Sequence, residues 1–121
     1  MPKTILVVDD EKNIVEVLKL RLEANGYKVD AAYDGEEGLQ KARTGKYDLI
    51  LLDLTLPKRD GQSVCLELKM DSKVSKVPIV MLTARSQSKE KEIGKKMGAD
   101  AYITKPFDSK ELLSTIQRLT K

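Results

Sequence analysis

The chain has 121 residues, 40% of them hydrophobic and 34% charged, a balance that predicts one compact, water-soluble domain rather than a disordered segment. The absence of histidine excludes Ser-His-Asp and Cys-His catalysis and the common zinc-ligand sets, so any bound metal should be a hard cation held by oxygen. The net charge of +3 is mild and the lysines are spread along the chain, so we expect no direct nucleic-acid binding.

The chain also lacks the marks of an exported or membrane protein. No apolar run approaches the roughly 20 residues that a membrane-spanning helix needs. The apolar run that leads up to Asp9 has only four residues, too few for a signal peptide. Cys65 is the only cysteine, so no disulfide can form within the chain, which agrees with a reducing compartment. We therefore expect a cytoplasmic protein with no membrane partner.

Buried strands and amphipathic helices alternate along the chain. The elements expected first are a strand at 5–8, a helix ended by Asn25-Gly26, a strand at 28–32, a helix capped by Asp34 and a strand at 49–52. They are followed by a helix at 62–70, a strand at 77–82, a helix at 88–97, a strand at 101–104 and a helix capped by Asp108. Glu37 and Glu111 complete capping-box patterns with the two aspartates. The alternation predicts an α/β fold with a parallel sheet, in one domain spanning residues 1–121.

Four of the expected strands end on polar side chains. The first is followed by Asp9 and Asp10, the third by Asp53, the fourth by Thr83 and the fifth by Lys105. Each alone has a simple explanation, as a helix cap or a surface lysine. In an open parallel sheet, however, ligands bind outside the carboxyl ends of the strands. The coincidence of four such ends therefore favours a chemically active crevice.

The chemistry of this crevice follows from its charges. Three carboxylates and one lysine leave a net charge of −2. The crevice should therefore either raise the pKa of one of its carboxyl groups or hold a divalent cation. Mg²⁺ favours carboxylate oxygens and keeps waters that a phosphate can displace. The hydroxyl of Thr83 and the ammonium of Lys105 remain to bind anionic oxygens, which makes a phosphoryl-transfer site. The carboxylate of Asp53 can itself be the nucleophile.

Four short motifs occur in a specific order and spacing along the chain: Val7-Val8-Asp9-Asp10-Glu11, Asp53-Leu54-Thr55-Leu56-Pro57 with Asp60-Gly61, Leu82-Thr83-Ala84, and Gly98-Ala99-Asp100-Ala101-Tyr102-Ile103-Thr104-Lys105-Pro106-Phe107. Together they resemble the response-regulator receiver domain of two-component signalling, of the chemotaxis-regulator-like type, over essentially the whole chain. The resemblance implies a doubly wound, flavodoxin-like (βα)₅ sheet with strand order 2-1-3-4-5.

The resemblance also implies a role for the acidic positions. Asp53 matches the phosphoacceptor. Asp10 and Asp53 match direct ligands of Mg²⁺, for which Mn²⁺ can substitute, and Asp9 matches a ligand that acts largely through water. The backbone carbonyl of Thr55 matches the remaining protein ligand. These residues are expected to form the metal site.

The phosphate-binding positions are implied in the same way. Thr83 and Lys105 match the hydroxyl and the ammonium that bind the phosphoryl oxygens, and Ala84 matches a small residue that leaves this group room. The Lys105–Pro106 peptide is expected to be cis, which would help to hold the lysine inward.

Further matches to the receiver family imply a conformational switch and a long lifetime of the bound phosphate. Phosphorylation should draw Thr83 toward the phosphate, and Tyr102 should move into the vacated space. The face built from the fourth helix, fifth strand and fifth helix should then change shape for partner binding. Thr55 and Arg85 flank the path of the hydrolytic water and are neither acids nor amides, so autodephosphorylation should be slow.

The expected donor is a sensor histidine kinase or a phosphotransfer protein, and the protein should catalyse only its own phosphorylation and dephosphorylation. No output domain follows the fifth helix, so a stand-alone receiver and the amino-terminal part of a longer regulator are both open, as is a phosphorylation-dependent homodimer.

Two other functions deserve comparison. A Mg²⁺-dependent phosphatase that forms an aspartyl phosphate would resemble the haloacid-dehalogenase-like enzymes, which need an acid where Thr55 stands. A flavin-binding electron carrier would need a phosphate-binding loop after the first strand, where Asp9 and Asp10 would repel the cofactor phosphate.

Overall fold

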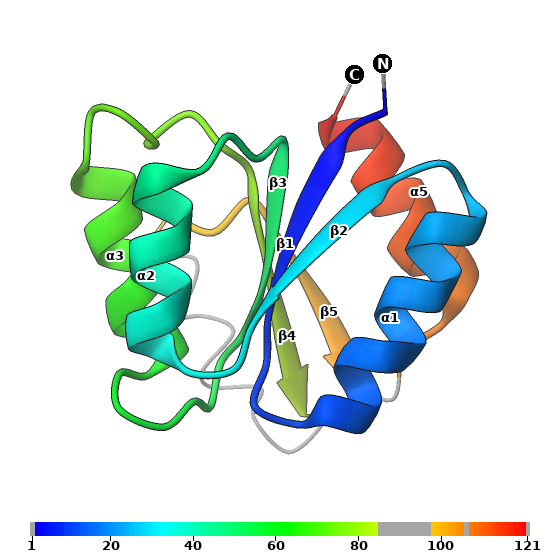
Figure 1. Ribbon diagram of the computed structural model, residues 1–121, viewed down its shortest axis with the longest axis horizontal. Coiled ribbons are helices and arrows are strands. Elements are labelled where there is room, and N and C mark those ends of the chain that lie inside the picture. The colour runs from blue at the N-terminus through cyan, green and yellow to red at the C-terminus, as the bar shows by residue number, and fades with distance from the viewer. Residues whose placement is uncertain (1, 85–97, 106, 121) are drawn as a thin grey trace.

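The computed structural model describes residues 2–84, 98–105 and 107–120 (Figure 1). The helix predicted at 88–97, the Arg85 side chain and the peptide bond before Pro106 lie outside these residues. The predictions made for them are therefore not tested by the structure.

Five parallel strands form one sheet in the order β2-β1-β3-β4-β5, which confirms the predicted α/β fold and strand order. β1 and β3 lie in its interior, whereas β2 and β5 are its edges. The strands are β1 (Thr4–Val8), β2 (Lys28–Ala32), β3 (Leu49–Asp53), β4 (Ile79–Ala84) and β5 (Ala101–Lys105). The described helices are α1 (Lys12–Ala24), α2 (Gly35–Thr44), α3 (Gly61–Met70) and α5 (Ser109–Leu119).

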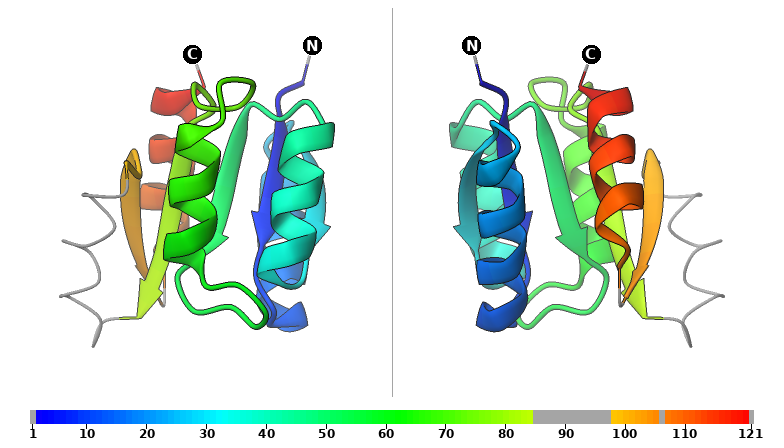
Figure 2. Two further views of the ribbon diagram at one scale, coloured as in Figure 1. Left: turned by 90° about the vertical axis from the view of Figure 1, so that its left-hand side faces the viewer. Right: turned by 90° about the vertical axis from the view of Figure 1, so that its right-hand side faces the viewer.

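Helices cover both faces of the sheet. The side views show α2 and α3 on one face and α1 and α5 on the other (Figure 2). Alternate residues of β1 serve the two faces, as the pleat of a strand requires: Leu6 and Val8 pack in one core cluster, Ile5 and Val7 in the other. Burial on both sides explains why β1 and β3 read as continuous apolar runs. Within the described part of the chain, no helix is long and apolar enough to cross a membrane.

Local sequence signals explain most helix ends. α1 ends at Ala24 with Asn25 as its C-cap, and Gly26 follows with a φ of +90°, the left-handed conformation expected of a glycine after a helix. Asp34 caps α2 by accepting from the Glu37 amide, as predicted. The Glu37 carboxylate accepts from the Tyr33 amide, one residue before the cap.

The start of β4 and the hydrogen bond that caps α5 differ from the sequence expectation. β4 begins at Ile79 rather than at residue 77, because the Val77 amide is used in a turn with Val74 and Pro78 has no amide hydrogen to donate. The Asp108 carboxylate accepts from the Lys110 amide, one residue earlier than a capping box with Glu111 requires.

A close backbone contact fixes the start of α3. The Gly61 amide donates to the Leu54 carbonyl at 2.9 Å, and a Cβ at Gly61 would lie 2.1 Å from the carbonyl oxygen of Asp53. We expect Gly61→Ala to lower the free energy of unfolding by about 1–3 kcal/mol, because backbone must move to relieve the overlap. Urea denaturation measures this effect.

Gly26→Ala is the matched control, since nothing lies within 4 Å of a Cβ there and the positive φ alone is unfavourable, at about 1 kcal/mol. A Gly61→Ala protein as stable as the wild type would contradict the close contact.

Candidate functional site

Three carboxylates meet at the carboxyl ends of the interior strands β1 and β3. One oxygen from each of Asp9, Asp10 and Asp53 lies within 4.8 Å of the others. The parallel pairing of Val8 with Leu52 brings the two strand ends side by side. Asp9 is 0% and Asp53 6% exposed, whereas Asp10 is exposed. The cluster therefore has a buried floor and one acid at its mouth.

A lysine from the edge strand β5 reaches this cluster. The Nζ of Lys105 lies 3.0 Å from Oδ2 of Asp9 and 3.5 Å from Oδ2 of Asp53. It also lies 3.7 Å from Oε1 of Glu11, a residue to which sequence reasoning assigned no role although it directly follows the two aspartates. Burial disfavours the charged lysine, but the hydrogen bond to Asp9 and the three carboxylate charges outweigh it and raise the pKa of Lys105.

The two buried carboxylates differ in their partners. Asp9 is fully engaged: Oδ1 accepts from the Glu11 amide at 2.9 Å and Oδ2 from Lys105. Asp9 thus stabilises the turn before α1 and also belongs to the cluster. Oδ1 of Asp53 accepts a longer bond, 3.3 Å, from the Thr55 amide.

The pKa of Asp53 is raised to about 6. Desolvation is the main cause and the charge of Asp9 adds to it, whereas Lys105 and the Thr55 amide lower the pKa by smaller amounts. The charge of Asp53 is therefore held at a cost to the stability of the fold.

Thr83 and Tyr102 place buried hydroxyls in neighbouring strands. Thr83, in β4, is 1% exposed, and its Oγ1 has no hydrogen-bond partner among the described atoms. The hydroxyl of Tyr102, in β5, is buried and unpartnered in the same sense, and its pKa is raised to about 12, mainly by burial. Ala84 ends β4 in register with Lys105. A buried hydroxyl without a partner costs about 1–3 kcal/mol, which suits a donor used by a group that binds from outside.

The donor set fits Mg²⁺. The cluster offers three hard carboxylate oxygens, with Lys105 compensating only part of their charge. Neither histidine nor cysteine belongs to the cluster, which argues against a zinc site. Cys65 instead lies buried in the core, where desolvation raises its pKa to about 11.

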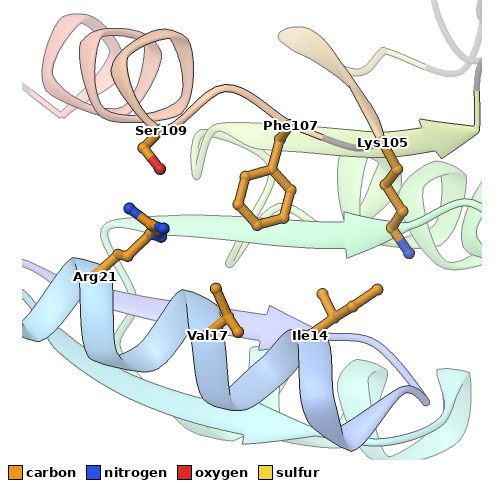
Figure 3. A pocket seen from close by; sticks show the side chains of 6 residues that line it. All are labelled: Ile14, Val17, Arg21, Lys105, Phe107 and Ser109. Atoms are coloured by element: carbon orange, nitrogen blue, oxygen red, sulfur yellow. The ribbon is translucent and has the colours of Figure 1, made fainter.

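A pocket of about 300 Å³ lies beside this site, between α1 and the segment that joins β5 to α5. Figure 3 shows the Phe107 ring pointing toward α1, with Lys105 alongside. Its lining residues are Ile14, Val17, Arg21, Lys105, Phe107 and Ser109. Lys105 therefore links an apolar surface to the acidic cluster.

The chain is similar in sequence and fold to known proteins. The chain is 47% identical over 121 residues to the alkaline phosphatase synthesis transcriptional regulatory protein PhoP of Bacillus subtilis (strain 168), an alignment that covers 100% of this chain and 50% of PhoP. The chain thus spans about half the length of the curated relatives it matches.

Two solved structures are similar over nearly the whole chain. The chemotaxis response regulator CheY4 of Vibrio cholerae has a TM-score of 0.91 at 34% identity, covering 98% of this chain and 99% of CheY4. The receiver domain of a sensor histidine kinase from Pseudomonas aeruginosa has a TM-score of 0.92 at 32% identity, covering 99% and 98%, and its structure has a magnesium ion coordinated in the active site cleft.

The family model of the response regulator receiver domain matches residues 5–117. That span contains β1 from Ile5 onward, the other four strands of the sheet, the acidic cluster and Lys105. The chain belongs to the response regulator receiver domain family of two-component signalling.

Proposed function

We propose that residues 1–121 act as one cytoplasmic receiver domain of a phosphorelay, in which Asp53 accepts a phosphoryl group from a histidine kinase or a phosphotransfer protein. The observation that carries the proposal is the grouping of Asp9, Asp10 and Asp53 within 4.8 Å, with the ammonium of Lys105 3.5 Å from Asp53. This combination of acids and one cation suits transfer of an anionic group to a carboxylate.

The chain's own residues have distinct tasks in this transfer. An oxygen of ionised Asp53 forms a bond to phosphorus as the bond from phosphorus to the donor's histidine nitrogen breaks. Lys105 then holds a phosphoryl oxygen, and the unpartnered hydroxyl of Thr83 donates to another. An alanine at position 84 would leave the phosphoryl group room.

Asp9, Asp10, Asp53 and the backbone carbonyl of Thr55 would hold Mg²⁺, with Mn²⁺ as a substitute. When bound, the ion supplies positive charge against the phosphoryl oxygens. Asp9 already accepts hydrogen bonds from Lys105 and from the Glu11 amide, so it holds the lysine and the turn before α1 in place.

Signal output would depend on Thr83 and Tyr102. Movement of the Thr83 hydroxyl toward a phosphoryl group would open space next to β5, and the Tyr102 ring would occupy it. The Tyr102 hydroxyl is buried and has no hydrogen-bond partner among the described atoms, so it is not held in place by such a bond. A shift in the population of these states would alter the face that includes β5 and α5.

The donor protein would approach over the pocket beside Lys105. Ile14, Val17 and Phe107 give this pocket apolar walls, and Val17 is 43% exposed. An apolar contact next to the acceptor would position a phosphohistidine without adding charge to the acidic cluster. The downstream partner, or an output domain as in the longer relatives, would bind the face in the conformation that it takes after phosphorylation.

The bound phosphate should be long-lived. Neither Thr55 nor Arg85 offers the acid or amide that would orient a hydrolytic water. Thr55 also stands where the alternative function, an aspartyl-phosphate phosphatase, would need its general acid.

Incubation with Mg²⁺ and acetyl phosphate tests the proposal. We expect one phosphoryl group per chain, stable in acid and labile in base, and none on Asp53→Asn. Intact-mass spectrometry measures the adduct, and Asp108→Asn is a matched control because asparagine also caps a helix. Multiple turnovers of a phosphate ester would instead support the phosphatase.

A further inference from the structure

The loop that joins β3 to α3 is pressed against the start of α2. The Gly35 amide, the first of α2, donates to the Pro57 carbonyl at 3.2 Å. A Cβ at Gly35 would lie 2.0 Å from the carbonyl oxygen of Arg59. The backbone at the first residue of the helix therefore lies directly against the backbone of the loop.

The loop has a conformation that its own residues do not favour. Lys58 has a φ of +66°, in the left-handed region that non-glycine residues rarely adopt. Such a conformation costs of order 1 kcal/mol or more and persists where surrounding contacts hold it. Within the loop, the Arg59 amide donates to the Pro57 carbonyl at 2.7 Å across Lys58, and contacts outside the loop add to this restraint.

Arg59 makes the contacts best placed to do so. Its guanidinium pairs with Glu36 of α2 at 3.5 Å and with Glu67 of α3. Among the described residues, Lys58 pairs with Asp34 alone, at 3.6 Å, and its side chain is far more exposed than that of Arg59. A planar guanidinium can engage two carboxylates at once, whereas an ammonium is a point charge on a flexible stem.

We infer that Arg59 is a positioning residue: by joining Glu36 and Glu67 it holds the loop that carries Thr55 against the acidic cluster, and so sets the cluster's affinity for Mg²⁺. The inference rests on the proposed function, because Thr55 matters only if its carbonyl is a ligand. The loop also starts directly after Asp53, so its position is coupled to two of the residues assigned to the metal.

The physical reason is the orientation of ligands by their neighbours. Without Arg59, Glu36 and Glu67 lose their shared cation and Lys58 can relax from its left-handed conformation. Residues that orient metal ligands from outside commonly change metal affinity by about tenfold or more. The same coupling makes the position of the α2 start dependent on the occupancy of the cluster.

The Mg²⁺-dependent rise in Tm of the full chain, measured without a phosphodonor, tests the inference. We expect Arg59→Ala to weaken the apparent Mg²⁺ affinity by about tenfold and Arg59→Lys to restore it in part. Arg43→Ala is the matched control, because Arg43 pairs with Asp71 at 3.3 Å near the other end of α2. It should bind Mg²⁺ as the wild type does.

Acetyl phosphate adds a second readout. The initial rate of phosphorylation of Arg59→Ala should fall at limiting Mg²⁺ and recover at saturating Mg²⁺, which a general loss of stability would not produce. Wild-type Mg²⁺ affinity in Arg59→Ala, or an equal loss in Arg43→Ala, would overturn the inference. A wild type that binds Mg²⁺ but forms no adduct counts against the proposed function alone.

Discussion

Replacement of Lys105 by methionine should lower the free energy of unfolding at neutral pH by about 3 kcal/mol, the cost typical of breaking a largely buried ion pair. The side chain of Lys105 is only 17% exposed, and its ammonium lies within 3.5 Å of both buried carboxylates. Its removal leaves Asp9 and Asp53 facing each other without a cation. It should also raise the pKa of Asp53 further, because Lys105 is one of the groups that lower it.

Urea denaturation with and without Mg²⁺ measures this effect. Mg²⁺ should recover much of the lost stability, since a cation at the cluster again offsets the carboxylates. Lys110→Met is the control, because Lys110 is exposed and its removal should change stability by no more than about 0.5 kcal/mol. Equal losses in the two variants would show that Lys105 does not compensate the acidic cluster.

Asp53→Asn should be more stable than the wild type above pH 6, by about 3 kcal/mol, because each pKa unit corresponds to about 1.4 kcal/mol. The pKa of Asp53 is about 6 in the folded protein, against an ordinary value of 3.8. Between these pH values the folded wild type binds more protons than the unfolded chain, so its stability falls as the pH rises. Asparagine carries no charge and escapes this loss.

The gain from Asp53→Asn should therefore vanish below about pH 4, where the aspartate is protonated in both states. Denaturation across pH 4–8 in the absence of Mg²⁺ measures it, with Asp108→Asn, at an exposed helix cap, as a control that should gain no stability. A gain of the same size at every pH would mean that burial of charge at Asp53 is not its cause.

Much of the fold could be predicted because its signals are local. Apolar runs, helix-ending Asn25-Gly26 and the Asp34 cap each act within a few residues, and parallel strands must bring their carboxyl ends to one edge. This last rule is what placed Asp53 among other polar strand ends. The start of β4 was missed because Pro78 removes a ladder donor, a detail that an apolar run does not reveal.

Side-chain partners were much less predictable. Lys105 and Asp9 are separated by 96 positions and meet only because β5 and β1 lie in one sheet, and Glu11 joins them through the turn after β1. The loop after Asp53 was recognised only by its turn residues. Arg59 restrains this loop by pairing with Glu36 of α2 and Glu67 of α3, and these two helices come together only when the protein folds.

The acids of this site lie at the ends of interior strands and the lysine lies on an edge strand, and these strands separate from the sheet at different free energies. β1 and β3 are flanked by strands on both sides, so exposing Asp9 or Asp53 requires nearly global unfolding. β5 pairs only with β4 and can separate in a local, cheaper fluctuation that carries Lys105 away. A ligand that bound the carboxylates and Lys105 together would suppress the local opening of β5. Amide hydrogen exchange in β5 would therefore report on the occupancy of the site.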